Sequence, residues 1–479
     1  MALEAIFRTG KNAGMLLAGT MTRMIASFVF VVYCADQLGV EGFGQYTIAV
    51  HYFELFLSLT ATAVGILLTR DMSRWPRHSY QLMTSAIVLV MLMSVLSIVA
   101  MSTMGFLSGY SAETCQALMI ASLALVPASA CAVFEAVFVA RERAEFVTIG
   151  VAIESLLKIG LSIALLAAGY GLLALMWVVL CVRLALMFAY LLGLARIGSL
   201  GWKYHHRRSL RFVNCWRMFA AENWMATIYT NLDVLVLSWF SGEVAVGIYN
   251  AAWKIVRLGA VVARAYTTAV FPVMSRLHAE SVESFNRLYR HTIRVMFALA
   301  LPAIAVISIV PDRMVGLLFN EEYAAAAPVL QVLAWVLLID FLNPFLSYTL
   351  FAQGQQNKSM RVAGISLLVN SVATYALVLK FGAVGAAIGT VIGGFVAMSC
   401  YLFYAMPKSE VLTTVGLGLR VAVAALGMGI VVYTIRDSAW IKLLPVGALV
   451  YTPLLFVVGA IRIADLRFFQ TIFLARASS

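Results

Sequence analysis

The chain has 479 residues, of which 63% are hydrophobic and only 12% are charged. Soluble domains carry about 25% charged residues, so this composition excludes an ordinary water-soluble protein. It predicts an integral membrane protein, in which the bilayer is the apolar solvent. The net charge of +12 fits basic cytoplasmic loops, so we expect no nucleic-acid partner.

Fourteen segments are apolar over the roughly 20 residues that a membrane-spanning helix needs. The first span begins near Met15 and is too long for a signal peptide. Very short turns at 169–171 and 381–383 predict antiparallel helical hairpins. The expected spans are 12–35, 45–68, 81–106, 115–140, 147–168, 172–195, 213–240, 246–273, 294–318, 326–352, 362–380, 384–406, 412–435 and 443–462.

The distribution of Lys and Arg between alternate loops predicts the topology. One set of loops, which includes both termini, holds 22 of these residues, whereas the opposite set holds 3. Because positive residues accumulate on the cytoplasmic side, both termini are predicted to be cytoplasmic. We expect a multi-pass protein of the cytoplasmic (inner) membrane.

Similar motifs begin corresponding spans in the two halves of the chain. Gly44-Gln45-Tyr46 matches Gly247-Ile248-Tyr249 at an offset of 203, and the segments that begin at Tyr170 and Phe381 match at an offset of 211. These offsets predict two six-helix bundles related by a pseudo-twofold axis, with a site at their interface, plus two additional C-terminal helices. The expected domains are 1–196, a basic linker at 197–212, 213–406, and 407–479 with the last two helices and a tail.

Several cations fall inside the predicted spans, where an ionisable group is costly and is usually functional. Lys254, Arg257 and Arg264 lie within about 80° of one another, along about 15 Å of one helix. Arg23 lies at a comparable depth in the first span. This stripe predicts an anion-binding cavity. Ion pairs with Glu54, Glu135 or Glu222, or unpaired residues at helix ends, would also explain it.

Acidic residues within the spans are fewer. Glu222 and Asp233 lie in span seven beside asparagines, where a carboxylate and amide oxygens could bind Na⁺ or a proton. A structural hydrogen-bond network is the alternative. Glu154 and Lys158, four residues apart, are expected to form an ion pair. Asp340 lies in span ten without an assigned role.

No enzymatic motif is present in the sequence: there is no P-loop, no HExxH, no nucleophile elbow and no Cys/His metal cluster. The predicted loops are too short for a soluble catalytic domain. We therefore expect a transporter and not an enzyme, with no cofactor beyond a coupling ion.

Four loose motifs, in order along almost the whole chain, resemble one known family. They are Leu38–Tyr46, Asp233 with Trp239–Tyr249, Leu318–Leu330 and Phe381–Ala387. The chain resembles the Wzx-type polysaccharide flippases of the multidrug/oligosaccharidyl-lipid/polysaccharide exporter (MOP) superfamily. The resemblance implies two bundles around a cationic cavity, with spans thirteen and fourteen forming a groove for a lipid tail.

The cargo that this resemblance implies is an oligosaccharide on undecaprenyl pyrophosphate, flipped from the inner to the outer leaflet by alternating access. Membrane lipids, and the polymerase and glycosyltransferases of the same pathway, are the implied partners. The lipid II flippase branch is similar and has a sodium site, whose positions match Asp233, Asn370, Thr374 and Thr390 here. Thr374 replaces a carboxylate of that site, so Na⁺, a proton or the membrane potential stay open as the driving force.

Two other functions remain open. One is an ion-coupled drug or metabolite antiporter of the same superfamily, whose cavity should be acidic instead of basic. The other is a polytopic enzyme of polysaccharide synthesis, which usually carries a large catalytic loop.

Overall fold

The computed structural model describes residues 2–198, 201, 203, 205–405, 408–438 and 440–459. Every regular element in these ranges is a helix, which confirms the all-α fold expected from the composition. The helices are long and mostly apolar, because in a bilayer a spanning segment must satisfy its backbone hydrogen bonds internally.

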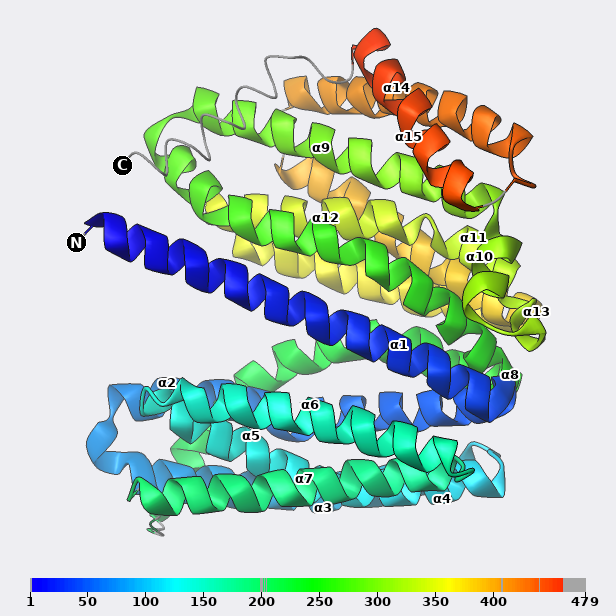
Figure 1. Cartoon of the computed structure of the whole chain (residues 1–479). Helices are drawn as coiled ribbons and strands as arrows, with labels where there is room; N and C mark the ends of the chain where they lie inside the picture. Colours follow the sequence, from blue (N-terminus) through cyan, green and yellow to red (C-terminus); the bar gives the residue numbers. More distant parts are fainter. Residues whose placement is uncertain are drawn as a thin grey trace. The chain divides into compact units, whose positions relative to one another are not determined.

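The first half of the chain contains seven α-helices, a π-helical turn (η1) and a 3₁₀ turn (η2) (Figure 1). Their bounds are α1 Ala2–Leu57, η1 Ser58–Thr62, α2 Ala63–Arg74, η2 Pro76–His78, α3 Ser79–Leu107, α4 Ala112–Leu123, α5 Leu125–Ala140, α6 Ala144–Ala167 and α7 Leu172–Arg196.

The second half contains eight α-helices and the 3₁₀ turn η3. Their bounds are α8 His206–Glu280, α9 Val282–Ile309, α10 Pro311–Leu318, η3 Glu321–Tyr323, α11 Ala326–Leu333, α12 Val336–Ala352, α13 Gln356–Ala405, α14 Lys408–Thr434 and α15 Trp440–Val457.

The chain divides into two compact units. One contains residues 27–250, and the other contains 1–26 together with 251–479. The long helices α1 and α8 each contribute to both units. The domain limits expected from the sequence, at 196, 212 and 406, stay a prediction.

Ten helical stretches of the described residues are long and apolar enough to cross a membrane. Two of these stretches, at 209–280 and 356–405, each correspond to two predicted spans, and the stretch at 26–74 covers the second predicted span and part of the first. A shorter apolar helix at Pro445–Val457 coincides with the last one. The multi-pass membrane architecture is thus supported, whereas the count of fourteen spans and the division into six plus six stay predictions.

Single glycines reverse the direction of α1 and α8. Gly39 (φ 68°, ψ −179°) and Gly242 (φ 80°, ψ −174°) adopt nearly the same positive-φ conformation, which only glycine adopts at little cost. Beyond each turn the chain folds back on itself. The rings of Phe30 and Tyr46 lie 6.4 Å apart, and the Tyr249 hydroxyl donates to Asp233. Residues 16 apart on a straight helix would be separated by about 24 Å.

The two hairpins cross each other at a pair of glycines. A Cβ added at Gly44 would overlap the carbonyl oxygen of Glu243, and a Cβ added at Gly247 would overlap the carbonyl oxygen of Val40. The offset of 203 residues that relates Gly44 to Gly247 also relates Val40 to Glu243. The contact of Gly44 with Glu243 and the contact of Gly247 with Val40 are therefore equivalent under the repeat. The crossing therefore has the form that a local twofold axis would give.

The turn at Gly382 folds α13 into a third hairpin. The arm after the turn places Gly389 against Thr374 and Gly393 against Asn370 on the first arm. This confirms the antiparallel hairpin predicted at 381–383. It also shows that the glycines at every fourth position serve close helix packing.

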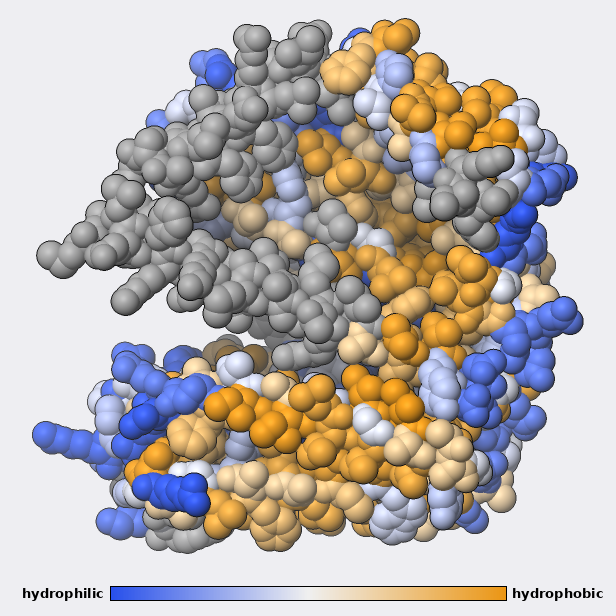
Figure 2. Space-filling model, viewed as in Figure 1, coloured by the Kyte–Doolittle hydropathy of each residue, from blue (hydrophilic) through white to orange (hydrophobic). Residues whose placement is uncertain are grey.

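Each unit combines a packed interior with a largely apolar surface. In residues 27–250 a core joins α2, α3, α5, α7 and the first turns of α8, and in the other unit α9 packs against α14 and α15. Apolar residues cover the middle of the helices, and hydrophilic residues gather at the helix ends (Figure 2). This is the distribution that a lipid environment requires.

The glycine crossing yields a direct prediction. Replacing Gly44 by Ala should destabilise the protein by about 1–3 kcal/mol, because the added methyl group meets a backbone carbonyl that cannot move freely. Thermal unfolding of the purified protein in detergent would show a lower melting temperature.

Gly160→Ala is the matched control, since an added Cβ there has no neighbour within 4 Å. Alanine favours the helix, so this variant should melt at the wild-type temperature or above it. Equal melting temperatures for the two variants would contradict the close crossing.

Candidate functional site

The cationic stripe lies on α8 after its turn at Gly242. Arg257 and Arg264 are exposed, and Lys254 is partly buried. The opposite side of the same helix is packed, since Val256 and Ala263 are buried. The sequence placed the three cations on one side, and the structure shows that this side is turned away from the helix-packing face.

Neither arginine of the stripe is neutralised by a contact ion pair in the described part of the chain. The Arg257 guanidinium lies 5.4 Å from the centre of the Trp253 ring, a cation–π arrangement that holds the side chain without using its N–H donors. The guanidinium of Arg264 has no contact with a carboxylate among the described residues. The backbone carbonyl oxygen of Arg264 accepts a hydrogen bond from the Thr268 hydroxyl. Both groups can therefore still bind an anion.

The other two predicted cations are less well defined. Lys254 already interacts with another group of the protein. The side chain of Arg23 lies outside the described part of the structure, although its backbone belongs to α1. Arg257 and Arg264 are thus the two members of the stripe with a described, accessible guanidinium.

Asp233, predicted as a coupling residue, is buried in the unit formed by residues 27–250. The Tyr249 hydroxyl donates to one of its carboxylate oxygens, and the backbone N–H of Val234 donates to the other at 2.9 Å. The offset of 203 residues between the two halves makes Phe30 the counterpart of Asp233, and Tyr46 the counterpart of Tyr249. The first half therefore has an aromatic ring at the position where the second half has a carboxylate.

Asn370 and Thr374, both buried in the other unit, lie one turn apart on α13. The Thr374 hydroxyl donates to Asn370 Oδ1 at 3.0 Å. Thr390, on the second arm of α13, donates to the carbonyl oxygen of Ala386 at 3.1 Å. The side chain of Glu222 lies outside the described residues.

The structure therefore brings Asn370 and Thr374 together, and it shows Asp233 in a hydrogen-bonded pair of its own. No cluster of three or more His, Cys, Asp or Glu side chains that could hold a metal occurs among the described residues. Asp233, Asn370, Thr374 and Thr390 as one cation site stay a prediction.

One ion pair differs from expectation. Glu154 on α6 pairs with Arg183 on α7 at 3.0 Å, instead of with Lys158 on its own helix. The expected pair was wrong because spacing along one helix does not reveal a better partner on its neighbour. Nearby, the Tyr190 hydroxyl donates to Glu135 at 3.2 Å.

A carboxylate that the sequence did not single out joins three segments next to the glycine crossing. Glu243 accepts bonds from Gln45 Nε2 (2.9 Å) and from the backbone N–H and hydroxyl of Ser111 (3.0 and 2.9 Å). Glu243 lies between the predicted spans seven and eight. Burial raises its pKa, but hydrogen bonds from Thr114, Gln45 and Ser111 outweigh burial and hold the pKa below its ordinary value.

Arg313, another cation of the predicted spans, has a structural role. Its guanidinium donates to the carbonyl oxygen of Ser438 at 2.8 Å and also to those of Arg436 and Asp437. These carbonyls belong to the turn that follows α14, so the arginine fixes this turn to α10.

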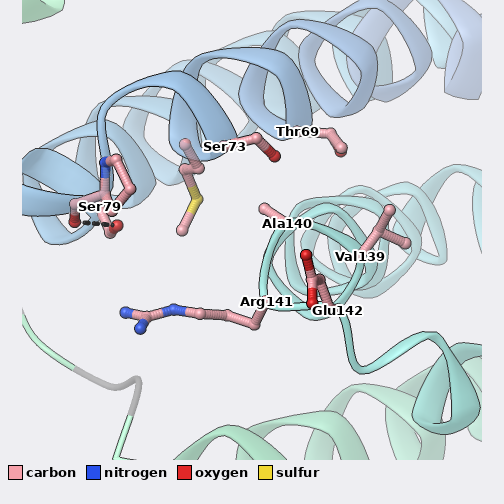
Figure 3. Close-up of a pocket in the computed structure, with 9 residues that line it drawn as sticks. Thr69, Ser73, Ser79, Val139, Ala140, Arg141 and Glu142 are labelled. Carbon is pink, nitrogen blue, oxygen red and sulfur yellow. Dashed lines mark hydrogen bonds between the residues drawn. The ribbon is translucent and has the colours of Figure 1, made fainter.

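A cavity of about 500 Å³ opens elsewhere, between the end of α2, η2 and the turn after α5. It is lined by Thr69, Ser73 and Ser79 and by the turn residues Arg141 and Glu142 (Figure 3). The Arg141 side chain extends away from the Glu142 carboxylate. None of the predicted site residues lines this cavity.

The bond between Tyr249 and Asp233 yields a second prediction. Tyr249→Phe removes the hydroxyl donor and leaves a buried carboxylate oxygen unsatisfied, which should cost about 1–3 kcal/mol of stability. The melting temperature in detergent should fall. Tyr170→Phe, at an exposed position, should leave it unchanged. If both variants melted like the wild type, the bond would not support the fold.

Two family models match the chain. The model described as "Polysaccharide biosynthesis protein" matches residues 9–278, which is more than half of the chain. The MatE model matches residues 219–376. The first match covers the glycine crossing and the cationic stripe.

Curated relatives have similar names. The probable low-salt glycan biosynthesis flippase Agl15 of Haloferax volcanii is 24% identical over 41% of this chain and 42% of its own length. The capsular polysaccharide biosynthesis protein CapF of Staphylococcus aureus is 22% identical over 38% and 46%. The chain thus spans less than half the length of these two. The probable flippase AglR of H. volcanii is 22% identical over 90% of both chains.

Solved structures share the fold. An inward closed conformation of the lipid II flippase MurJ superposes with a TM-score of 0.77, covering 92% of this chain and 98% of that chain at 16% identity. An inward-facing multidrug resistance MATE transporter of the MOP superfamily has a TM-score of 0.64, covering 82% and 95% at 15% identity. The chain therefore belongs to the polysaccharide biosynthesis protein family of the MOP superfamily, as the resemblance in its sequence predicted.

Proposed function

We propose that this protein is a flippase that moves an oligosaccharide linked to undecaprenyl pyrophosphate from the inner to the outer leaflet of the cytoplasmic membrane. The observation that carries the proposal is the pair of exposed, unneutralised guanidinium groups of Arg257 and Arg264 within an apolar helix. The product would serve the synthesis of a surface polysaccharide such as O-antigen, capsule or exopolysaccharide.

The chemistry of the stripe suits a pyrophosphate. Each guanidinium presents a planar fork of N–H donors that binds phosphate oxygens in pairs. A cation inside a spanning helix is costly unless it gains a partner or lines a wet cavity. An anionic head group would supply that partner during transport, while the polyprenyl tail stays in the lipid.

The names of the relatives support this proposal. Two of them are named as flippases and one as a capsular polysaccharide biosynthesis protein. All of these proteins are similar to this chain at only 22–24% identity, so the saccharide and the lipid carrier are proposals for this chain. The polymerase and glycosyltransferases of the same pathway would be its partners.

In the proposed mechanism Arg23, Lys254, Arg257 and Arg264 bind the head group from the cytoplasmic side, with both termini in the cytoplasm. The protein then rocks by alternating access and releases the head group outside. Binding of Na⁺ or a proton, or the membrane potential, would drive the cycle. The residues that we propose for this coupling are Asp233, Asn370, Thr374, Thr390 and Glu222.

A drug antiporter of the same superfamily is the second candidate, and the MatE match at residues 219–376 favours it. An antiporter for cationic drugs should bind its substrate through acids, whereas the accessible charges on α8 are basic. Drug resistance conferred by expression in a sensitive strain, without restoration of surface polysaccharide in a flippase-null strain, would favour the antiporter.

Substitution of the two arginines tests the flippase directly. Arg257→Ala and Arg264→Ala together should reduce surface polysaccharide by about tenfold or more when the variant is expressed in a flippase-null strain, because the pyrophosphate loses its paired guanidinium donors. Lys in place of Arg at both positions should restore surface polysaccharide only in part, because an ammonium group lacks the paired N–H donors of a guanidinium group.

Arg276→Ala is the matched control. Arg276 is an exposed arginine of the same helix, near Glu280 at 4.0 Å, and lies outside the stripe. It should restore polysaccharide fully. Full restoration by the double variant at normal expression would show that the stripe does not carry the head group.

A further inference from the structure

Asp340 is a charged residue of the spanning helices that the proposed transport site does not use. It is the only charged residue of α12, and its side chain is partly buried. It has no hydrogen bond or ion pair with any other described residue. A carboxylate in this position is costly unless positive charge lies close by.

The packing of α12 against α8 places this carboxylate beside the cationic stripe. A Cβ added at Gly259 of α8 would meet the Leu337 side chain of α12. Further along, the rings of Phe271 and Tyr348 lie 4.8 Å apart. The residue numbers rise together on both helices from the first contact to the second, so the two helices run parallel in this region.

The alignment of the two helices determines the position of Asp340 along the axis of α8. It follows Leu337 by less than one turn, so it lies level with about residue 262 of α8, between Arg257 and Arg264 and nearer to Arg264. It is rotated by about 60° from Leu337 around the axis of α12, which keeps it on the side of that helix that borders α8.

Another side of α12 packs against the second arm of α13. Asn343 donates to the carbonyl oxygen of Gly394 at 3.1 Å, and a Cβ added at Gly394 would meet Ile339. Around the axis of α12, Asp340 falls between this face and the face toward α8, since Leu337 and Asn343 lie about 60° from it on either side. The carboxylate is therefore at the edge of the contact with α8 and is not enclosed by α13.

The electrostatics agree with this geometry. Burial disfavours the charged form of the Asp340 carboxylate, whereas the attraction of Arg264, and to a smaller degree that of Arg257, favours it. Neither arginine forms a contact ion pair with it among the described residues. A carboxylate at this range stabilises both cations in a medium of low dielectric constant, yet it leaves their N–H donors free.

We propose that Asp340 is a positioning and specificity-determining residue of the transport site, which acts as the internal counter-charge of Arg257 and Arg264. It compensates the two guanidinium groups when the site is empty and opposes the anionic head group when the site is loaded. The repulsion between the Asp340 carboxylate and the head group limits the affinity of the site for pyrophosphate. A pyrophosphate group that binds on one side of the membrane can therefore leave on the other. The inference rests on the proposed function.

Binding and transport by the purified full-length protein test this role. Asp340→Asn keeps the size of the side chain and removes its charge, so inorganic pyrophosphate should bind about tenfold more tightly in isothermal titration in detergent. In proteoliposomes with a pyrophosphate-linked lipid oligosaccharide, the same variant should have a lower KM and a lower kcat, because release becomes slow. Asp340→Glu should restore wild-type values in large part.

Asp312→Asn is the matched control, because it removes the same charge from an exposed position in the first turn of α10. It should leave binding and transport unchanged. Melting temperatures of all variants would separate a loss of folding from a change of affinity, and Asp340→Ala, which also removes the charge, takes the place of Asp340→Asn if that variant unfolds.

The possible failures can be told apart. If the wild type binds no pyrophosphate and moves no lipid, the proposed function fails and this inference with it. If the wild type binds pyrophosphate and Arg264→Ala abolishes binding, but Asp340→Asn binds with unchanged or weaker affinity, then the counter-charge role is wrong while the flippase stands. KM and kcat that fall together in Asp340→Asn support the role.

Discussion

The cost of charge in the bilayer constrains every part of the proposed site. Arg257 and Arg264 lie within a stretch of α8 that is apolar enough to cross a membrane, and a lipid environment tolerates such groups only beside water, a counter-charge or an anionic ligand. Asp340 supplies partial compensation from the parallel helix α12, without a contact pair that would occupy the guanidinium donors. An acid that neutralised the arginines completely would stabilise the empty protein, but it would also remove the ability to bind a phosphate.

A second constraint is steric, and it concerns how the hairpins of α1 and α8 approach each other. Glycines at Gly44 and Gly247 allow backbone contact, and the turns at Gly39 and Gly242 reverse both helices in the same way. Glu243 adds hydrogen bonds to this region. Gly247 lies on the second arm of α8, directly after the turn at Gly242, so the crossing fixes the first turns of that arm against α1.

Much of this fold could be predicted from local sequence patterns. Apolar length and the alternation of basic loops indicated a multi-pass helical protein, and the repeat that relates Gly44 to Gly247 anticipated contacts that the structure contains. Patterns along one helix could not reveal partners on another, which is why Glu154 pairs with Arg183 and why the role of Asp340 emerged only from the register of α8 and α12. The hydrogen bond from Tyr249 to Asp233 could not be predicted from the sequence either, because it forms only when the chain reverses direction at Gly242.

The central claim is that the two guanidinium groups of α8 bind the phosphate groups of a lipid-linked saccharide during its translocation. The most direct measurement reconstitutes the purified protein in liposomes and follows the arrival of the saccharide in the opposite leaflet with a membrane-impermeant glycosidase. The account predicts rapid, saturable translocation by the wild type and little above protein-free liposomes for the variant that lacks both Arg257 and Arg264. Equal rates for the two proteins, at equal reconstitution and folding, would contradict it.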